Sequence, residues 1–347
     1  MQVTALLALA ATALAGPTGK FFDNYIFVIM ENNDLTATLK SPEYAALIGQ
    51  SVEFLDYHGT IHPSQPNYWS TIAQDTFRDF IVPNLTVSSG QSNSASDVGT
   101  KINGNNGDDF FNIEGVRNIA DSLEDAGISW AIYSENYPGN ATYCHTGDFG
   151  TEPNVTDANN IGNPFRLYKR KHNPFMSFTS INTNTTRCGQ HVFGFDAWEA
   201  AVAADTFPEY TYIVPNQLDD AHDFPGDANP TLDQVGLAYS GAWLKTFLAS
   251  IANSTYLNTR RTLIHITFDE DDEAYFLAGQ ANCTDTASDC PGDTTDNLVY
   301  GVLFGSAVAG LEGSTIAGHY DHYSIVATLN ENWGLPALTN ANSSGAP

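Results

Sequence analysis

The sequence predicts an α/β protein, a three-layer sandwich in which a mostly parallel central sheet lies between two layers of helices. Five short apolar runs rich in β-branched and aromatic residues are spaced along the chain, at residues 25–30, 130–133, 210–214, 262–268 and 298–304. Runs that are short and apolar throughout are typical of buried strands, and continuous hydrophobicity favours a parallel sheet covered on both faces. Helix-like segments alternate with these runs, and this alternation is typical of a three-layer α/β sandwich.

Helices are predicted where apolar residues recur at helical spacing. Residues 119–126 show this pattern and stop before Gly127, and residues 232–252 show it over a longer span. A third helix-compatible run, 69–75, follows a proline-rich turn. The chain has no internal repeat and no long low-complexity linker, so we expect residues 16–347 to form a single domain.

The composition excludes some partners. Hydrophobic residues make up 42% of the chain, which is enough for a sizeable core. Lys and Arg total 13 against 40 Asp and Glu, which gives a formal net charge of -27 and a sequence pI near 4.3. Such a surface repels nucleic-acid backbones and anionic membranes, so no stable nucleic-acid partner is expected. It suits an acidic medium, where partly protonated carboxylates repel one another less.

The N-terminus and the glycosylation motifs predict an extracellular protein. Residues 1–15 form an apolar run that ends in Ala-Leu-Ala, the small-residue pattern of a signal-peptide cleavage site. The run is too short for a membrane anchor, and a buried N-terminal helix is the alternative. We therefore expect secretion, with or without cell-wall association. Seven Asn-x-Ser/Thr motifs lie in polar, turn-rich segments, at Asn84, Asn140, Asn154, Asn184, Asn253, Asn282 and Asn342.

The four cysteines predict disulfides. An even number of cysteines in a secreted chain favours disulfides over metal ligation, and the spacing lacks the paired C-x-x-C form of zinc sites. Three connectivities are compatible with the sequence. We favour Cys283 with Cys290, which leaves Cys144 with Cys188.

Polar side chains follow three of the predicted strands at the point where each strand ends. Residues 25–30 run into Glu31 and Asn32, residues 210–214 into residues 215–217, and residues 262–268 into Asp269 and Glu270. Open α/β sheets place their binding sites at the carboxyl ends of the strands. Converging carboxylates at this edge are also what a metal site requires.

The segment 62–68 reads His-Pro-Ser-Gln-Pro-Asn-Tyr and is made rigid by two prolines. Because a helix-compatible run follows it, this turn can present Ser64 at the N-terminus of a helix. Backbone amides and the helix dipole stabilise phosphate oxygens there. A serine in a proline-rich turn is more often structural when no other motif supports it, so the Ser64 assignment depends on the rest of the chain.

Several separated motifs together resemble the secreted acid phosphatases and phospholipase C-type phosphoesterases, a branch of the alkaline phosphatase superfamily. The likeness to fungal acid phosphatases covers most of the chain. The motifs lie at residues 27–32, 63–67, 168–175 with 215–223, 268–272 and 319–324. The resemblance implies an alkaline phosphatase-like fold and a hydrolase that acts on phosphoric ester bonds, with small phosphomonoesters as substrates.

The resemblance also implies the site residues. The metal ligands would be Glu31, Asn32, Ser64, Asp269 and Glu270. The catalytic residues would be Ser64 as nucleophile, Asn67 beside the phosphate oxygens, and His172, Asp219, His222 and His322 in or near the phosphate pocket. His62 is held in reserve, and His58, His145, His191 and His265 are interpreted as structural. The oxygen-rich ligand set favours one divalent ion, with Mg²⁺, Ca²⁺, Mn²⁺ and Zn²⁺ all open.

The expected reaction is hydrolysis of phosphate monoesters through a phosphoserine at Ser64, with a histidine protonating the leaving group in acid. The alternatives are a phospholipase C-type phosphodiesterase and a non-catalytic glycoprotein that binds phosphate or sugar. A serine esterase of the α/β-hydrolase type is disfavoured, because Ser64 lacks the G-x-S-x-G context. The sequence leaves the oligomeric state open.

Overall fold

The computed structural model describes residues 18–33, 35–61, 64–77, 85–87, 111–156, 164–221, 233–271 and 297–338. Several predicted features lie outside these ranges. They are the leader 1–15, His62, His222 and the Cys283–Cys290 pair.

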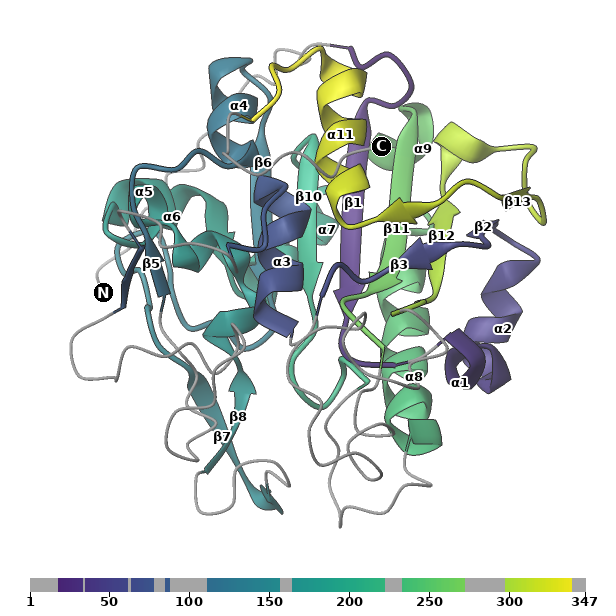
Figure 1. The fold of residues 1–347 in the computed structure, drawn as a ribbon, viewed down its shortest axis with the longest axis horizontal. Coiled ribbons are helices and arrows are strands. Elements are labelled where there is room, and N and C mark those ends of the chain that lie inside the picture. The colour runs from purple at the N-terminus through teal and green to yellow at the C-terminus, as the bar shows by residue number, and fades with distance from the viewer. Residues whose placement is uncertain are drawn as a thin grey trace, which may run out of the picture.

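An eight-stranded sheet forms the centre of the described fold (Figure 1). Its strand order is β13 (Thr315–Ile316), β2 (Val52–Phe54), β12 (Gly301–Phe304), β11 (Thr262–Phe268), β1 (Asn24–Met30), β10 (Tyr210–Val214), β6 (Trp130–Ser134) and β9 (Val192–Phe193). Strands β11, β1, β10, β6 and β9 are parallel, whereas β12 runs antiparallel to both of its neighbours. The mostly parallel sheet confirms the predicted fold class.

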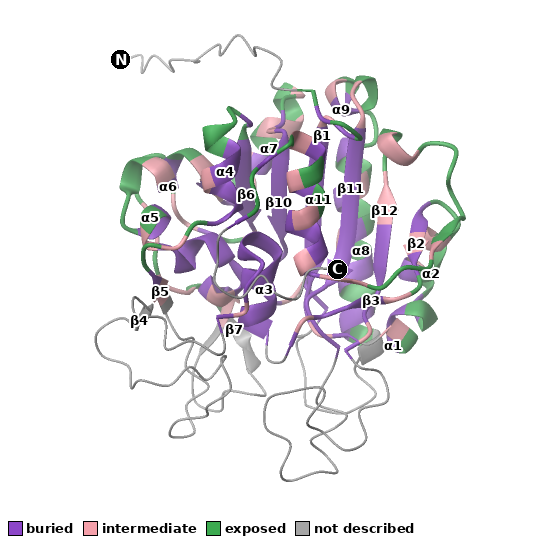
Figure 2. Ribbon diagram, turned by 45° about the horizontal axis from the view of Figure 1, so that its top comes forward, coloured by how far each residue is buried: buried purple, intermediate pink, exposed green. Residues whose placement is uncertain are grey.

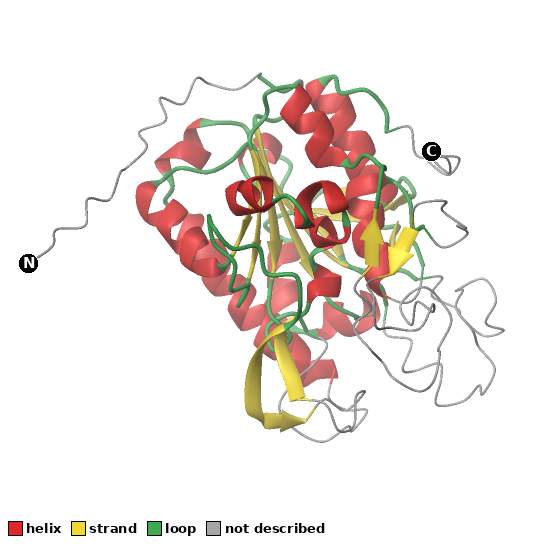
Figure 3. Ribbon diagram, turned by 90° about the vertical axis from the view of Figure 1, so that its left-hand side faces the viewer, coloured by secondary structure: helices red, strands yellow, loops and turns green. Residues whose placement is uncertain are grey.

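Helices cover both faces of the sheet, so the fold has three layers (Figure 3). Alternate side chains of β1 enter two separate apolar clusters, with Phe27 and Ile29 on one face and Ile26 and Val28 on the other. The helices on the Phe27 face are α3 (Ser64–Ala73), α4 (Ile119–Asp125), α5 (Thr179–Asn182), α6 (Thr185–His191) and α11 (Tyr323–Trp333). Those on the opposite face are α1 (Leu35–Lys40), α2 (Pro42–Ile48), α7 (Phe195–Ala204), α8 (Asp233–Ile251) and α9 (Thr255–Thr259).

The burial of the strands explains why they could be predicted. All seven residues of β1, all seven of β11 and all five of β10 are buried (Figure 2). A strand covered on both faces needs no polar side, which accounts for its continuous apolar run. Strand β12 differs, because only Gly301–Phe304 of the predicted run 298–304 pairs within the sheet.

Shorter elements complete the fold, and none was predicted. Three two-stranded pairs form from β3 (Tyr57–His58) with β14 (Tyr320–Asp321), β4 (Leu85–Val87) with β5 (Phe111–Ile113), and β7 (Phe149–Thr156) with β8 (Pro164–Tyr168). Three 3₁₀ turns lie at Arg170–His172, Pro174–Ser177 and Ser306–Val308. Most of these segments are two to four residues long, too short for hydrophobic periodicity to reveal them.

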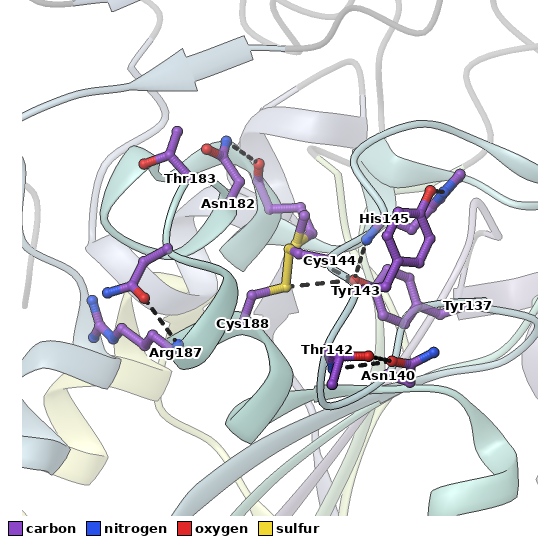
Figure 4. Close-up of a disulfide and its surroundings, with 12 residues drawn as sticks. Tyr137, Asn140, Thr142, Tyr143, Cys144, His145, Asn182, Thr183, Arg187 and Cys188 are labelled. Carbon is purple, nitrogen blue, oxygen red and sulfur yellow. Dashed lines mark hydrogen bonds between the residues drawn. A yellow bond between two sulfur atoms is a disulfide. The ribbon is translucent and has the colours of Figure 1, made fainter.

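A disulfide joins Cys144 to Cys188, which confirms one of the two predicted pairs (Figure 4). It ties the loop after β6 to α6 across a sequence separation of 44 residues. The hydroxyl of Tyr137 packs against both sulfur atoms, 3.8 Å from that of Cys144 and 3.5 Å from that of Cys188. Tyr137 also accepts a hydrogen bond from the backbone amide of His145 at 3.0 Å, so the loop is anchored at several points.

Among the described residues, no helix has the length and apolarity that crossing a bilayer requires. The longest, α8, spans Asp233–Ile251.

Candidate active site

The register between β1 and β11 brings their polar exits together. Met30 lies opposite Phe268 in the parallel ladder, and the amide of Asp269 donates to the carbonyl of Met30 at 3.0 Å. Glu31 and Asp269 therefore leave the sheet side by side at its carboxyl edge. This is the placement predicted from the acidic residues that follow each apolar run.

Helix α3 begins at Ser64, and the Ser64 side chain lies at the carboxyl edge of the sheet, beside the acidic residues. The Ser64 hydroxyl lies 2.9 Å from Oε1 of Glu270, 3.4 Å from Oε2 of Glu31 and 3.4 Å from Oδ1 of Asn32. The predicted helix N-terminus is confirmed, although the helix starts earlier than the run 69–75. Pro66 does not prevent this, since the first turn of a helix leaves its backbone amides unpaired in any case.

The predicted metal ligands thus surround one hydroxyl with oxygen acceptors. A serine hydroxyl donates a single hydrogen bond, so it can satisfy only one of the three oxygens around it. Asp269 is fully buried, and its Oδ2 meets no hydrogen-bond donor among the residues that the structure describes. Buried, oxygen-only and strongly negative, this donor set fits a hard divalent cation.

The pKa of Asp269 shows that this arrangement disfavours a negative charge on its carboxyl. Burial raises the pKa of its carboxyl well above the ordinary value, and the nearby carboxylates of Glu31 and Glu270 raise it further. Lys171 opposes the shift. Glu31 and Glu270 are themselves only 1% and 2% exposed. Three acids that water cannot reach need a compensating cation or a proton.

His172 and Asp220 lie at the same centre. Nε2 of His172 is 2.7 Å from Oε1 of Glu31, and its Nδ1 is 4.0 Å from Oδ2 of Asp220. The Tyr68 ring stacks on the imidazole with the centroids 4.9 Å apart, which holds the ring in its plane. The backbone carbonyl of Asp220 also accepts from the amide of Glu31 at 2.8 Å.

Asp219 contacts Glu135, the residue that follows β6. Burial, and then the Asp219 carboxylate, raise the pKa of Glu135 to about 7. The sequence nominated Asp219, whereas the contact with His172 is made by its neighbour Asp220. Both residues belong to the same acidic motif, and the role predicted for Asp219 in the phosphate pocket stays a prediction.

His322 contacts the backbone of the site and not its carboxylates. Its Nε2 lies 2.5 Å from the backbone carbonyl of Asp269 and its Nδ1 lies 3.3 Å from the Tyr57 hydroxyl. A neutral ring satisfies both contacts, because Nε2–H donates to the carbonyl while Nδ1 accepts from the phenol. Burial lowers the pKa of His322 to about 4, in agreement with a neutral ring. One nitrogen thus holds the backbone of Asp269, and the other holds the ring against Tyr57 of β3.

Asn67 also acts on the geometry of the site. Its Oδ1 accepts from the backbone amides of Thr60 and Ile61 at 2.8 and 3.0 Å. Its Nδ2 donates to the carbonyl of Ile61 and lies 3.3 Å from Oε2 of Glu270. The amide therefore fastens the chain before Ser64 to helix α3 and contacts one predicted metal ligand.

The histidines interpreted as structural fall into two groups. His265 is buried in β11, where the Tyr25 hydroxyl lies 2.8 Å from its Nδ1 and burial lowers its pKa to about 3. His191 stacks on Trp130, and His145 contacts Tyr143. His58 differs, because it joins Asp56 and His319 in a compact group apart from Ser64.

A family model for phosphoesterases matches residues 42–336. The chain belongs to the phosphoesterase family. This confirms the resemblance inferred from the motifs. A phosphate-repressible acid phosphatase of Penicillium chrysogenum is 27% identical over 95% of this chain, and an acid phosphatase of Aspergillus fumigatus is 27% identical over 92%. A phosphatidylinositol-3-phosphatase of Mycobacterium tuberculosis is 24% identical over 95% of this chain and 81% of its own length.

This phosphoesterase spans about three fifths of the length of the fungal relatives, 64% of the Penicillium protein and 57% of the Aspergillus protein. Solved structures share its fold. An alkaline phosphatase superfamily protein from Vibrio parahaemolyticus superposes with a TM-score of 0.50 at 12% identity, over 91% of this chain and 67% of that one. Murine ectonucleotide pyrophosphatase/phosphodiesterase 5 also gives 0.50, at 11% identity over 91% and 96%. The fold is therefore alkaline phosphatase-like.

Replacing Asp269 by asparagine should stabilise the metal-free protein. The folded-state pKa of Asp269 is raised above the ordinary aspartate value of about 3.9, so its ionisation destabilises the fold as pH rises above about 4. We expect metal-free wild type to lose stability as pH rises above about 4, and Asp269→Asn to lose less. At pH 7 the variant should gain at least about 1 kcal/mol in denaturant unfolding with chelator present.

The stabilisation by metal should be lost in the variant. Added Mn²⁺ should raise the melting temperature of wild type but not of Asp269→Asn, because the variant loses a charged ligand. Glu199→Gln, which removes one exposed charge on α7, is the control for the general effect of net charge. A variant that is less stable than wild type in chelator would contradict the buried-charge account.

Proposed function

We propose that this phosphoesterase is an acid phosphatase that hydrolyses phosphate monoesters with Ser64 as nucleophile. One observation carries the proposal: Ser64 opens helix α3 with its hydroxyl against Glu270, Glu31 and Asn32. A hydroxyl at a helix N-terminus lies where backbone amides favour phosphate oxygens. The fungal relatives named above support the phosphomonoester class.

Glu31, Asn32, Ser64, Asp269 and Glu270 would hold one divalent cation. Bound there, the cation would lower the pKa of the Ser64 hydroxyl and offset the charge of the surrounding carboxylates and the phosphate. Mg²⁺, Ca²⁺ and Mn²⁺ suit an all-oxygen ligand set best, and Zn²⁺ remains in the proposal.

The reaction would proceed in two displacements. In the first, Ser64 Oγ loses its proton and forms a bond to phosphorus, the ester P–O bond breaks, and the leaving alkoxide takes up a proton from a pocket histidine. In the second, water forms a bond to phosphorus, the phosphoserine P–O bond breaks and inorganic phosphate is released. The hydrogen bond from Ser64 to Glu270 aligns the hydroxyl and gives its proton a carboxylate acceptor.

His172 is the histidine that the geometry favours for work in the pocket. It is buried beside Glu31, and Asp220 stands on the other side of the ring. In this proposal Asp220 takes the place predicted for Asp219, and it orients His172 toward Glu31 and the phosphate. His322 and Asn67 are positioning residues, since their polar atoms hold Asp269 and the chain before Ser64. His222 stays a prediction.

We also propose that the protein is a secreted glycoprotein. The Cys144–Cys188 disulfide favours an oxidising compartment. Three of the asparagines in glycosylation motifs, Asn140, Asn184 and Asn253, are exposed, as glycan attachment requires.

The test of the central assignment is hydrolysis of p-nitrophenyl phosphate from pH 3 to 9, with and without chelator. We expect turnover on the acid side that chelator reduces and that Ser64→Ala lowers at least about 10³-fold. Ser250→Ala is the matched control, because its hydroxyl donates to the Phe247 carbonyl of its own helix. Full turnover by Ser64→Ala would remove Ser64 as nucleophile. Preference for bis(p-nitrophenyl) phosphate would favour the phosphodiesterase.

Asp220 and Asp219 offer an internal comparison between adjacent carboxylates. We expect Asp220→Asn to lower kcat/KM at least about tenfold, because it removes the charge facing His172. Asp219→Asn should change it less than about threefold, since Asp219 contacts Glu135. Steady-state kinetics of the two variants, with matched melting temperatures, decides between them. A larger loss in Asp219→Asn would restore the assignment made from the sequence.

A further inference from the structure

Three side chains that commonly bind metals gather at a second place, where β3 pairs with β14. Asp56 immediately precedes β3, His58 is the last residue of β3, and His319 immediately precedes β14. The two strands are parallel, with Tyr57 opposite Tyr320. Residues 261 and 263 positions apart in the sequence are thereby brought together. None of the three belongs to the group of Ser64, Glu31, Asn32, Asp269 and Glu270 (the Ser64 cluster).

The Asp56 carboxylate lies between the two imidazoles. Its Oδ1 is 2.7 Å from Nε2 of His58, and its Oδ2 is 3.1 Å from Nδ1 of His319. The two imidazole centroids are 4.7 Å apart, and one ligand atom from each of the three residues lies within 4.8 Å of the others. The His58 side chain is 11% exposed and that of His319 is 61% exposed, so one side of the group is fixed and the other is open to solvent.

We propose that Asp56, His58 and His319 form a second divalent metal site, suited to Zn²⁺. Two imidazole nitrogens and one carboxylate are a common zinc ligand set, and the open side leaves room for water as a fourth ligand. Zinc–ligand distances of about 2.0–2.2 Å place tetrahedral ligand atoms about 3.3 Å apart. The distances of 2.7 and 3.1 Å from the Asp56 oxygens to the imidazole nitrogens are close to this, and the exposed His319 can move inward while His58 stays fixed.

The surroundings favour a cation and separate this site from the first. Asp321 of β14 interacts electrostatically with His319, which adds a second negative charge near the group. The Ser64 cluster offers oxygen ligands only, whereas this group offers two nitrogens, so the two sites differ in the cation they prefer. An ion at the second site would join β3 to β14. The segments that follow these strands carry Ser64 and His322.

Zinc stoichiometry tests the proposal, with the Ser64 cluster weakened by Asp269→Asn in every protein compared. After chelator treatment and equilibrium dialysis against Zn²⁺ at neutral pH, we expect Asp269→Asn to retain one more zinc per chain than Asp269→Asn/His319→Ala. In binding titrations His319→Ala should lower the affinity for this zinc at least about tenfold. Asp269→Asn/His145→Ala is the control, since His145 is a partly exposed histidine elsewhere on the surface. It should retain the zinc.

Melting temperature supplies a readout that does not depend on turnover. Zinc should raise the melting temperature of Asp269→Asn, because it binds the folded group, and should not raise that of the His319→Ala double variant. His319→Gln keeps a polar side chain without an imidazole, and it should behave like His319→Ala. It provides a second test if the alanine variant folds poorly. Equal zinc content and equal zinc stabilisation with and without His319 would overturn the proposal.

Discussion

Buried negative charge at the carboxyl ends of two neighbouring strands is the constraint on which the rest of the site depends. Because β1 and β11 are parallel and in register, Glu31 and Asp269 must leave the sheet together, and Glu270 follows at once. All three side chains are buried. The protein therefore needs a cation or a shared proton at this point, whatever ester it acts on.

Protein contacts around the acids control their positions. His172 lies against Glu31, His322 holds the backbone of Asp269, and Asn67 reaches Glu270. The three residues come from η2 (Arg170–His172), the start of α11 and the first turn of α3, and α11 and α3 pack on the same face of the sheet. The geometry around Ser64 is thus built into the packing of that layer.

The fold and the location of the site could be predicted from the sequence because both follow from local patterns. The strands of the sheet centre are buried on both faces, so their apolar runs are continuous, and the polar residues after them mark the active edge. The acidic motif at residues 219–223 shows where such reasoning ends. Adjacent residues share a motif, but the backbone after β10 decides which carboxylate turns to His172.

The group of Asp56, His58 and His319 could not be found from the sequence for a related reason. It depends on the pairing of two strands of two residues each, which leave no periodic pattern. From the sequence alone, His58 is interpreted as a structural histidine in a loop. Only the long-range contact with His319 indicates that it could bind a metal.

The most direct test of the central claim is a crystal structure of the protein grown with Mn²⁺, measured for anomalous scattering. The account predicts an anomalous peak within bonding distance of Ser64 Oγ and of carboxylate oxygens from Glu31, Asp269 and Glu270. A fully bound Mn²⁺ elsewhere, with the Ser64 cluster free of metal and its acids in the same positions, would contradict it.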